Sequence, residues 1–357
     1  MTASPAFADR LLRWFDAHGR HDLPWQNPRT PYRVWVSEIM LQQTQVNTVK
    51  AYFERFMARF PTLEALAAAP LDAVLAQWAG LGYYARARHL HAAARVMVAQ
   101  GIPDTLACWL ALPGVGASTA AAIMAQAFDE PATILDGNVK RVMARHAGID
   151  TPIEQAATIH RLYDCARAYT PAYRSADYTQ AIMDLGATLC TRSQPQCSDC
   201  PVSADCVAWQ EGRVDELPAR RVRRSLPVRT TTFLALFDAD ERIWLTRRPS
   251  VGLWGGLWCL PECRVSADHG LPAAGESISP VCANATAAVP WAQFAHRFTH
   301  FELRASVRKT TKADSVGLAD DGAWFEVNRL LAARDIGLPK PIQTLLAANF
   351  PPNESIH

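Results

Sequence analysis

Residues 112–128 read LPGVGASTAAAIMAQAF, and this stretch decides the fold class of the N-terminal half of the chain. A Pro-Gly-x-Gly turn that opens a helix leaves backbone N–H groups pointing outward at the positive end of the helix dipole, where a phosphate can bind without a charged side chain. Gly114 and Gly116 are therefore candidate phosphate-binding residues. With a helix expected at about 104–110 in front of it, the turn predicts a helix-hairpin-helix. A plain turn between two helices is the alternative.

The sequence around this turn is helical in pattern over most of 7–209. Apolar residues recur at intervals of three and four, as in TLEALAAAPLDAVLAQWAGLGYY at 62–84, and Pro and Gly stand where helices join. At 357 residues the chain exceeds the size at which one hydrophobic core normally keeps growing, so two domains are expected. We assign residues 1–210 to a mainly α domain.

The composition changes after this domain. Residues 211–228 are rich in Arg and Pro and poor in apolar residues, which is typical of an inter-domain connector. Runs such as TTFLALFD and RIWLTRRP then predict strands, so residues 229–357 are expected to form a smaller α+β domain. Five arginines in and just after the connector are consistent either with a solvated linker or with a phosphate contact: Arg220, Arg221, Arg223, Arg224 and Arg229.

Net charge and hydropathy exclude some classes of protein. The chain carries 36 basic and 34 acidic side chains, a net charge of +2, so any nucleic-acid binding must come from local patches. No apolar run approaches the roughly 18 residues that a membrane helix needs. The N-terminus lacks the basic flank and apolar core of a signal peptide. We expect a cytoplasmic protein with no membrane partner.

A cluster of cysteines follows the predicted helical region. Residues 190–206 read CTRSQPQCSDCPVSADC, with the spacing C-x6-C-x2-C-x5-C. Structural zinc sites usually present two close cysteine pairs, whereas only one pair is present here. Four thiolates at one local site favour a [4Fe–4S] cluster over zinc. The predicted ligands are Cys190, Cys197, Cys200 and Cys206.

Two carboxylates, Asp136 and Glu38, are candidate catalytic groups. Asp136 begins a helix in ILDGNVKRVMARHAG, where it is either an N-cap, worth about 1 kcal/mol, or a catalytic group. Glu38, in YRVWVSEIMLQQTQV, lies on a largely apolar helix surface. Desolvation there would raise its pKa and make it a candidate general acid. A partly exposed helix glutamate is the alternative for Glu38.

The cysteine spacing, the hairpin turn, an Asp about twenty residues after it and the upstream Glu together resemble the helix-hairpin-helix DNA glycosylases of the endonuclease III superfamily. The resemblance covers residues 20–210. Within the superfamily, LPWQNPRTPYRVWVSEIMLQQTQV, GLGYYARARHLH and ILDGNVKR are similar to the bacterial adenine glycosylases. The segment TRRPSVGLWGGLWCLPE looks like the start of their Nudix-like C-terminal domain, although the Glu-dense helix that Nudix hydrolases need for Mg²⁺ does not follow.

The resemblance implies a reaction. Endonuclease III has a lysine after the hairpin turn that attacks the sugar, but this chain has Ser118, which cannot form a Schiff base. A monofunctional glycosylase in base excision repair is implied, one that hydrolyses the N-glycosidic bond of adenine mispaired with 8-oxoguanine or guanine. Two alternatives stay open: a bifunctional pyrimidine glycosylase and lyase, and an iron–sulfur DNA-binding or redox-sensing protein without base chemistry.

The same resemblance assigns roles to residues. Glu38 would protonate adenine N7 as the base leaves, and Asp136 would stabilise the oxocarbenium-like sugar, with Ser118 beside them. The residues that would fill the vacated base stack are Leu41, Gln43 and Tyr83, with core packing as the alternative for Leu41. The residues that would line the adenine pocket with Ser118 are Trp25, Gln26 and Gln180.

The C-terminal domain is implied to survey the lesion. The matching stretch is FTHF at 298–301, so Phe298, Thr299 and His300 are the candidate lesion-recognition residues. An ordinary strand segment, with Thr299, Phe301 and Leu303 on one face, is the alternative. The implied partner is double-stranded DNA with A:8-oxoguanine or A:G mispairs, bound by a monomer associated with the nucleoid.

Overall fold

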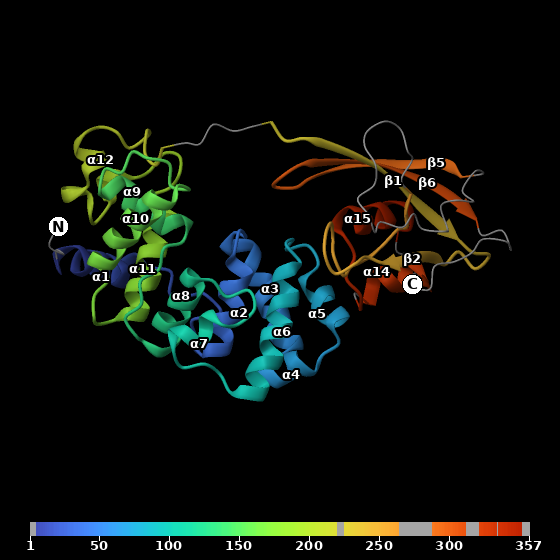
Figure 1. Cartoon of the computed structure of the whole chain (residues 1–357), viewed down its shortest axis with the longest axis horizontal. Helices are drawn as coiled ribbons and strands as arrows, with labels where there is room; N and C mark the ends of the chain where they lie inside the picture. Colours follow the sequence, from blue (N-terminus) through green and yellow to red (C-terminus); the bar gives the residue numbers. More distant parts are fainter. Residues whose placement is uncertain (1–4, 220–224, 264–287, 312–320, 334, 352–357) are drawn as a thin grey trace, which may run out of the picture. The chain divides into compact units, whose positions relative to one another are not determined.

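A computed structural model describes residues 5–219, 225–263, 288–311, 321–333 and 335–351 (Figure 1). The chain divides into two compact units: residues 1–68 with 89–223, and residues 69–88 with 224–357. Arg220, Arg221, Arg223 and Arg224, considered above as linker or phosphate-contact residues, lie outside the described residues. The domain boundaries proposed from the sequence stay predictions.

The first unit is built of helices, as expected for the mainly α region. Its helices are α1 (Pro5–His18), α2 (Pro31–Leu41), α3 (Val46–Arg59), α4 (Leu63–Ala68), most of α6 (Ala85–Gln100), α7 (Leu106–Leu110), α8 (Ala117–Phe128), α9 (Gly137–His146), α10 (Ala156–Tyr169), α11 (Ser175–Thr188) and α12 (Val207–Gln210). Two short 3₁₀ turns, η1 (Cys197–Asp199) and η2 (Ser203–Asp205), precede α12. Within the described residues, no helix is long and apolar enough to cross a bilayer.

The predicted helix-hairpin-helix is confirmed. Helix α7 starts at the N-cap Thr105, whose hydroxyl accepts from Cys108 N at 3.3 Å. Gly114 in the turn has φ +77°, and a Cβ there would lie 2.7 Å from the Cβ of His89. Both the backbone conformation and the close approach of α6 therefore require glycine at this position. Helix α8 then begins directly after Gly116.

Helix α8 is the centre of the helical unit. It packs against α2, α7 and α11 (Figure 1), and it buries Thr119 to Gln126 because its alanine-rich sequence allows close helix approach. Its Ala121 and Ala122 join a core that also contains residues of α1, α9, α10 and α11, such as Phe15, Met143 and Leu185. This packing fixes the positions of α2 and of the start of α9. These two segments carry the two predicted carboxylates.

The second unit contains a mixed seven-stranded sheet, as the α+β prediction requires. Its strands are β1 (Val228–Phe237), β2 (Ile243–Arg247), β3 (Trp258–Cys259), β4 (Glu262–Cys263), β5 (Val289–Arg297), β6 (Glu302–Thr311) and β7 (Gly322–Phe325), and its helices are α5 (Leu71–Trp78), α14 (Val327–Ala333) and α15 (Lys340–Asn349). The order is β3-β2-β1-β6-β5, while β4 pairs with β1 and β7 with β2. Strands β1 and β6 are parallel, and the other pairs are antiparallel.

The FTHF stretch is a turn, so the strand alternative for it is wrong. Strand β5 ends at Arg297 and β6 begins at Glu302. Phe298 N donates to Phe301 O at 2.9 Å and closes the turn between them. This hydrogen bond interrupts the alternation of side chains that a continuous strand would have, and it leaves Thr299 exposed at the tip.

Candidate active site

Glu38 is positioned by the start and the apolar face of α2. The helix begins at the N-cap Thr30, whose side chain accepts from Arg33 N at 3.3 Å, with a proline at the first helical position. Val34 and Trp35 are fully buried on this helix, and Glu38 follows them one turn later. Glu38 itself is half-buried, which is compatible both with a desolvated acid and with the alternative of a partly exposed helix glutamate.

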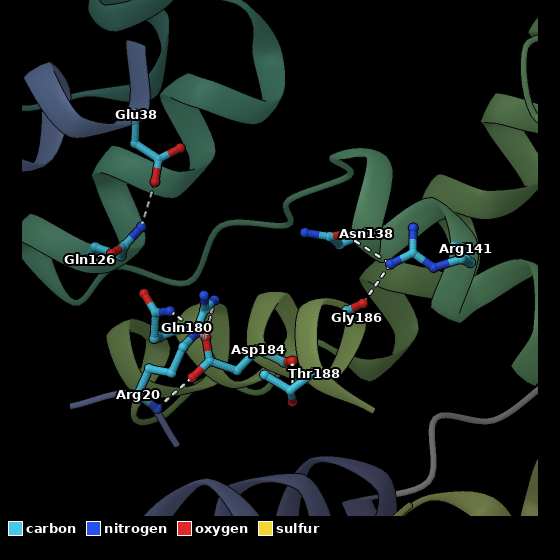
Figure 2. A network of polar contacts seen from close by, with 9 residues as sticks. All are labelled: Arg20, Glu38, Gln126, Asn138, Arg141, Gln180, Asp184, Gly186 and Thr188. Atoms are coloured by element: carbon cyan, nitrogen blue, oxygen red, sulfur yellow. Dashed lines mark hydrogen bonds and ion pairs between the residues drawn. The ribbon is translucent and has the colours of Figure 1, made fainter. Parts of the chain in front are cut away.

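The carboxyl group of Glu38 has one defined hydrogen-bond partner. Gln126 Nε2, on α8, donates to Glu38 Oε1 at 3.0 Å (Figure 2). Burial raises the pKa of Glu38 to about 7, the Gln126 hydrogen bond lowers it, and the nearby Asp136 carboxylate raises it. A pKa near neutrality keeps a large fraction of the group protonated at neutral pH, as a general acid requires.

Asp136 is the N-cap of α9, so the capping interpretation holds in this structure. Its Oδ1 accepts from Val139 N at 2.7 Å. Burial raises the pKa of Asp136, whereas the hydrogen bonds from the Val139 and Asn138 amides and the charges of Arg141 and Lys140 lower it. The cap and a catalytic role are compatible, because the cap uses one carboxylate oxygen for the helix and fixes the orientation of the other.

Ser118 lies in the first turn of α8, close to the segment that leads to Asp136. Its Oγ accepts from Leu135 N at 3.3 Å. The hydroxyl thus ties the hairpin helix to the residue before Asp136. Their shared catalytic role stays a prediction.

The predicted pocket residues Trp25, Gln26 and Gln180 are all buried. Trp25 packs edge-on against Phe53, with ring centroids 5.5 Å apart. The side-chain nitrogen Nε2 of Gln26 is buried and has no hydrogen-bond partner in the described part of the chain. A buried amide without a partner costs free energy, which a bound polar ligand would offset.

Gln180 belongs to a network that the sequence did not reveal. Its Nε2 donates to Asp184 Oδ1 at 2.6 Å, and Arg20 donates to both carboxylate oxygens of Asp184 (Figure 2). The Asp184 carboxylate is fully buried, but this charge-assisted pairing with Arg20 compensates for its lost hydration. The network orients the Gln180 amide.

The three residues expected to fill a vacated base stack differ in exposure. Leu41 ends α2 and is half-buried. Gln43 is exposed with φ +58°, and Tyr83, in the second unit, is 44% exposed with φ +50°. A left-handed backbone is uncommon for residues other than glycine, and such strained positions concentrate at functional sites.

The two hairpin glycines are not equivalent. Gly114 needs its left-handed φ, whereas Gly116, the N-cap of α8, has an ordinary φ of −94°. A Cβ on Gly116 would meet no atom within 4 Å, so glycine is not required there by the protein itself. The open space in front of the first turn of α8 is what the approach of a phosphate needs.

The candidate lesion-recognition residues lie beside a cluster of aromatic side chains. Phe298 packs against Phe301, with centroids 4.8 Å apart, and against Trp254 at 5.9 Å. The guanidinium of Arg229 lies 4.5 Å from the centroid of the Phe301 ring. The side chains of Thr299 and His300, in the same turn, are exposed.

The four predicted ligands Cys190, Cys197, Cys200 and Cys206 line one cavity. Among the described residues, no group of three or more His, Cys, Asp or Glu side chains is arranged so that it could hold a metal ion. Burial raises the pKa values of the Cys197, Cys200 and Cys206 thiols.

Arg145 contributes a buried positive charge to the wall of this cavity. It is 3% exposed, and its Nη1 donates to Cys190 Sγ at 3.4 Å and to Thr191 O at 2.6 Å. Its Nε donates to the carbonyls of Val214 and Leu217. Among the described residues, no carboxylate pairs with Arg145. A buried guanidinium without a counter-ion is costly, so this donor set fits an anionic group bound by thiolates.

Gln126, Asp184 and Arg145 are the functional candidates that sequence reasoning missed. Gln126 is a polar residue within an otherwise apolar helical run, AAIMAQAF, and that interruption was the available signal, whereas Arg145 lies in the basic helix GNVKRVMARH, which gives no such signal. No local pattern indicates which side chain each of them meets.

The chain is similar to proteins of known families. The model of the HhH-GPD superfamily of base excision DNA repair proteins matches residues 36–165, and a NUDIX domain model matches residues 232–348. The adenine DNA glycosylase of Buchnera aphidicola subsp. Acyrthosiphon pisum (strain APS) is 32% identical over 354 residues, covering 97% of this chain and 98% of that protein. The adenine DNA glycosylase of Mus musculus is 43% identical over 230 residues, covering 60% of this chain and 44% of that protein. Among solved structures, a thermostable thymine-DNA glycosylase matches with a TM-score of 0.52 and 28% identity, covering 57% of this chain and 95% of that one.

Proposed function

This chain belongs to the adenine DNA glycosylase family and is a DNA N-glycosylase of base excision repair, and we propose that it acts on adenine paired with 8-oxoguanine or guanine in double-stranded DNA. The single observation that carries the chemistry is the half-buried Glu38 carboxyl group, with a pKa of about 7 and Asp136 nearby. Enzymes that cleave glycosidic bonds usually use two carboxyl groups whose environments give them different pKa values.

In the proposed reaction, Glu38 gives its proton to N7 of adenine. The O–H bond of the carboxyl group breaks as the N7–H bond forms, and the electron pair of the glycosidic bond leaves with the base. The sugar acquires oxocarbenium character, which the Asp136 carboxylate stabilises. Water then adds its oxygen to the sugar carbon, and its released proton returns to the Glu38 carboxylate. Burial raises the pKa of Asp136, and the backbone amides that bond to it oppose this shift by favouring its ionised form.

Before this reaction, the adenine must leave the base stack. The cost is a few kcal/mol and is smallest for a mispaired base. We assign the adenine pocket to Trp25, Gln26 and Gln180, supported by the unpartnered buried amide of Gln26 and the fixed amide of Gln180. Gln43 and Tyr83 are proposed to contact the vacated stack, which their exposure and left-handed backbones support.

The DNA backbone is proposed to bind the hairpin. Gly116 leaves open space at the positive end of α8, which suits a phosphate. The turn at 298–301 is proposed to read the base opposite adenine, through Phe298 and the exposed Thr299 and His300.

We also propose that Cys190, Cys197, Cys200 and Cys206 hold a [4Fe–4S] cluster. Their common cavity and the buried charge of Arg145, which has no carboxylate partner in the described part of the chain, support this assignment. A bound cluster would supply charge and cross-links to the loop between α11 and α12. In this proposal Arg145 balances part of the negative charge of the thiolates.

Arg145→Met is therefore expected to lower the iron and sulfide content per chain and to lower the free energy of unfolding by about 3–5 kcal/mol. The substitution removes the buried positive charge and leaves the carbonyls of Val214 and Leu217 without a donor. Iron analysis, visible absorbance and thermal unfolding measure the effect. Arg167→Met is the control, because Arg167 is exposed and pairs with Asp164 at the surface of α10. An unchanged iron content in the Arg145 variant would contradict the assignment.

Strand cleavage tests the proposed function. In single-turnover assays on end-labelled duplexes with A opposite 8-oxoguanine, G or T, and thymine glycol opposite A, we expect breaks at A opposite 8-oxoguanine and G. These breaks should appear only after alkali, because Ser118 cannot form the Schiff base through which a lyase cuts the strand. Breaks at thymine glycol without alkali would instead identify a pyrimidine glycosylase and lyase.

A further inference from the structure

We propose that Gln126 is a positioning residue that gives the two oxygens of Glu38 different tasks: Oε1 is anchored by the Gln126 amide, and Oε2 carries the proton that goes to the departing base. The inference rests on the proposed role of Glu38 as general acid and specifies which atom of that acid reacts.

The geometry of the pair fixes the carboxyl group. Gln126 is 4% exposed on α8, and its Nε2 lies 3.0 Å from Glu38 Oε1 on α2. The two helices pack directly against each other, which fixes the backbone positions of the donor and acceptor residues relative to one another. Figure 2 shows the second carboxylate oxygen of Glu38 turned away from Gln126.

This hydrogen bond decides where the proton resides. An oxygen that accepts an N–H bond cannot also direct its own O–H at the same donor, since two donors would then face each other. Protonation at Oε1 would leave the Gln126 amide bonded to a hydroxyl oxygen, which is a weaker acceptor than the carbonyl oxygen of an acid protonated at Oε2. Protonation at Oε2 keeps the better acceptor opposite that amide, so the neutral acid carries its proton on the oxygen that points away from α8.

The same bond becomes stronger as the reaction proceeds. When the Oε2–H bond breaks and the N7–H bond forms, negative charge develops on Glu38. A hydrogen bond to an ionised group is about twice as strong as one between neutral groups, so Gln126 stabilises the transition state more than the ground state. Gln126 thus assists the reaction without touching the substrate.

Among the described groups around Glu38, Gln126 lowers the pKa of the carboxyl group. Helix α8 has no charged side chain, and the charged residues of α3, which also packs on α2, do not shift the pKa of Glu38. They are Lys50, Glu54, Arg55 and Arg59. The Asp136 carboxylate raises that pKa, as burial does, and the Gln126 hydrogen bond opposes both.

Gln126→Met tests the inference, because it removes the donor and keeps the length of the side chain. At the pH optimum, the single-turnover rate of adenine excision should fall about tenfold, a typical cost for one hydrogen bond to a charged group. The pKa of Glu38 should rise, so the high-pH limb of the rate profile, where the acid loses its proton, should move to higher pH. Met124→Leu, a buried change on the same helix, should leave both the rate and the profile unchanged.

A second background separates positioning from general damage. In a Glu38→Gln chain there is no acid to position, so adding Gln126→Met should not lower the residual rate further. If the original chain excises adenine but Gln126→Met leaves the rate and the high-pH limb unchanged, the inference is wrong while the proposed function stands. If the original chain excises no adenine from any of the duplexes, the proposed function itself fails. A loss of rate that persists equally in the Glu38→Gln background would also contradict the inference.

Discussion

Replacing Glu38 by glutamine is expected to lower the single-turnover rate of adenine excision by about 10²–10⁴-fold, the usual contribution of a general acid. The substituted amide has nearly the same shape and its oxygen can still accept from Gln126 Nε2, but it has no acidic proton to give to the base. Binding to a duplex with A opposite 8-oxoguanine should be retained, because the proposed phosphate and stacking contacts lie elsewhere.

Binding and excision are therefore measured together on the same duplex, by fluorescence anisotropy and by alkali-dependent cleavage. Glu54→Gln is a matched control, since Glu54 is an exposed helix glutamate on α3. Excision by the Glu38 variant near the original rate would remove Glu38 from the chemistry. It would also favour the alternative in which the chain only binds DNA, because a binding module does not depend on this carboxylate.

Asp136→Asn is expected to lower excision by about 10²–10³-fold, comparable to the loss of one preorganised electrostatic group at a transition state. Asparagine still accepts from Val139 N and is as good an N-cap as aspartate, so the helix should be preserved. What is lost is the negative charge next to the sugar. Single-turnover rates and thermal unfolding of the same preparations measure the two effects.

Asp136→Ala separates the cap from the chemistry. It removes both the charge and the cap, so it should reduce excision as much as Asp136→Asn and also cost about 1 kcal/mol of stability. An asparagine variant with nearly full activity, beside an alanine variant that fails only because it unfolds, would reduce Asp136 to a structural residue.

The parts of the site that follow from local sequence were predicted. The hairpin turn, the capping position of Asp136 and the apolar surroundings of Glu38 each depend on residues within a few positions of one another. At position 114 a local cause, the left-handed backbone angle, acts together with the close approach of His89, and both require glycine.

Long-range contacts were not predicted. Gln126 meets Glu38 across 88 residues of sequence, and Arg20 meets Asp184 across 164. Periodicity shows that a polar residue interrupts an apolar helix face, but the partner depends on how helices pack, which periodicity does not encode. At 298–301 the alternation of aromatic and polar residues also fits a strand, and the backbone hydrogen bond from Phe298 to Phe301 makes it a turn.

The parallel pairing of β1 with β6 has a consequence for the order in which the protein can fold during synthesis. Residues 228–237 pair with residues 302–311, so this edge of β1 has no partner until the chain has been extended by more than seventy residues. At about 5–20 residues per second, the wait is roughly 4–15 s. The buried half of β1, Phe233 to Phe237, is exposed to other nascent chains during that time. The helical segments before residue 210 have been synthesised by then, so the sheet is the later of the two parts to be completed.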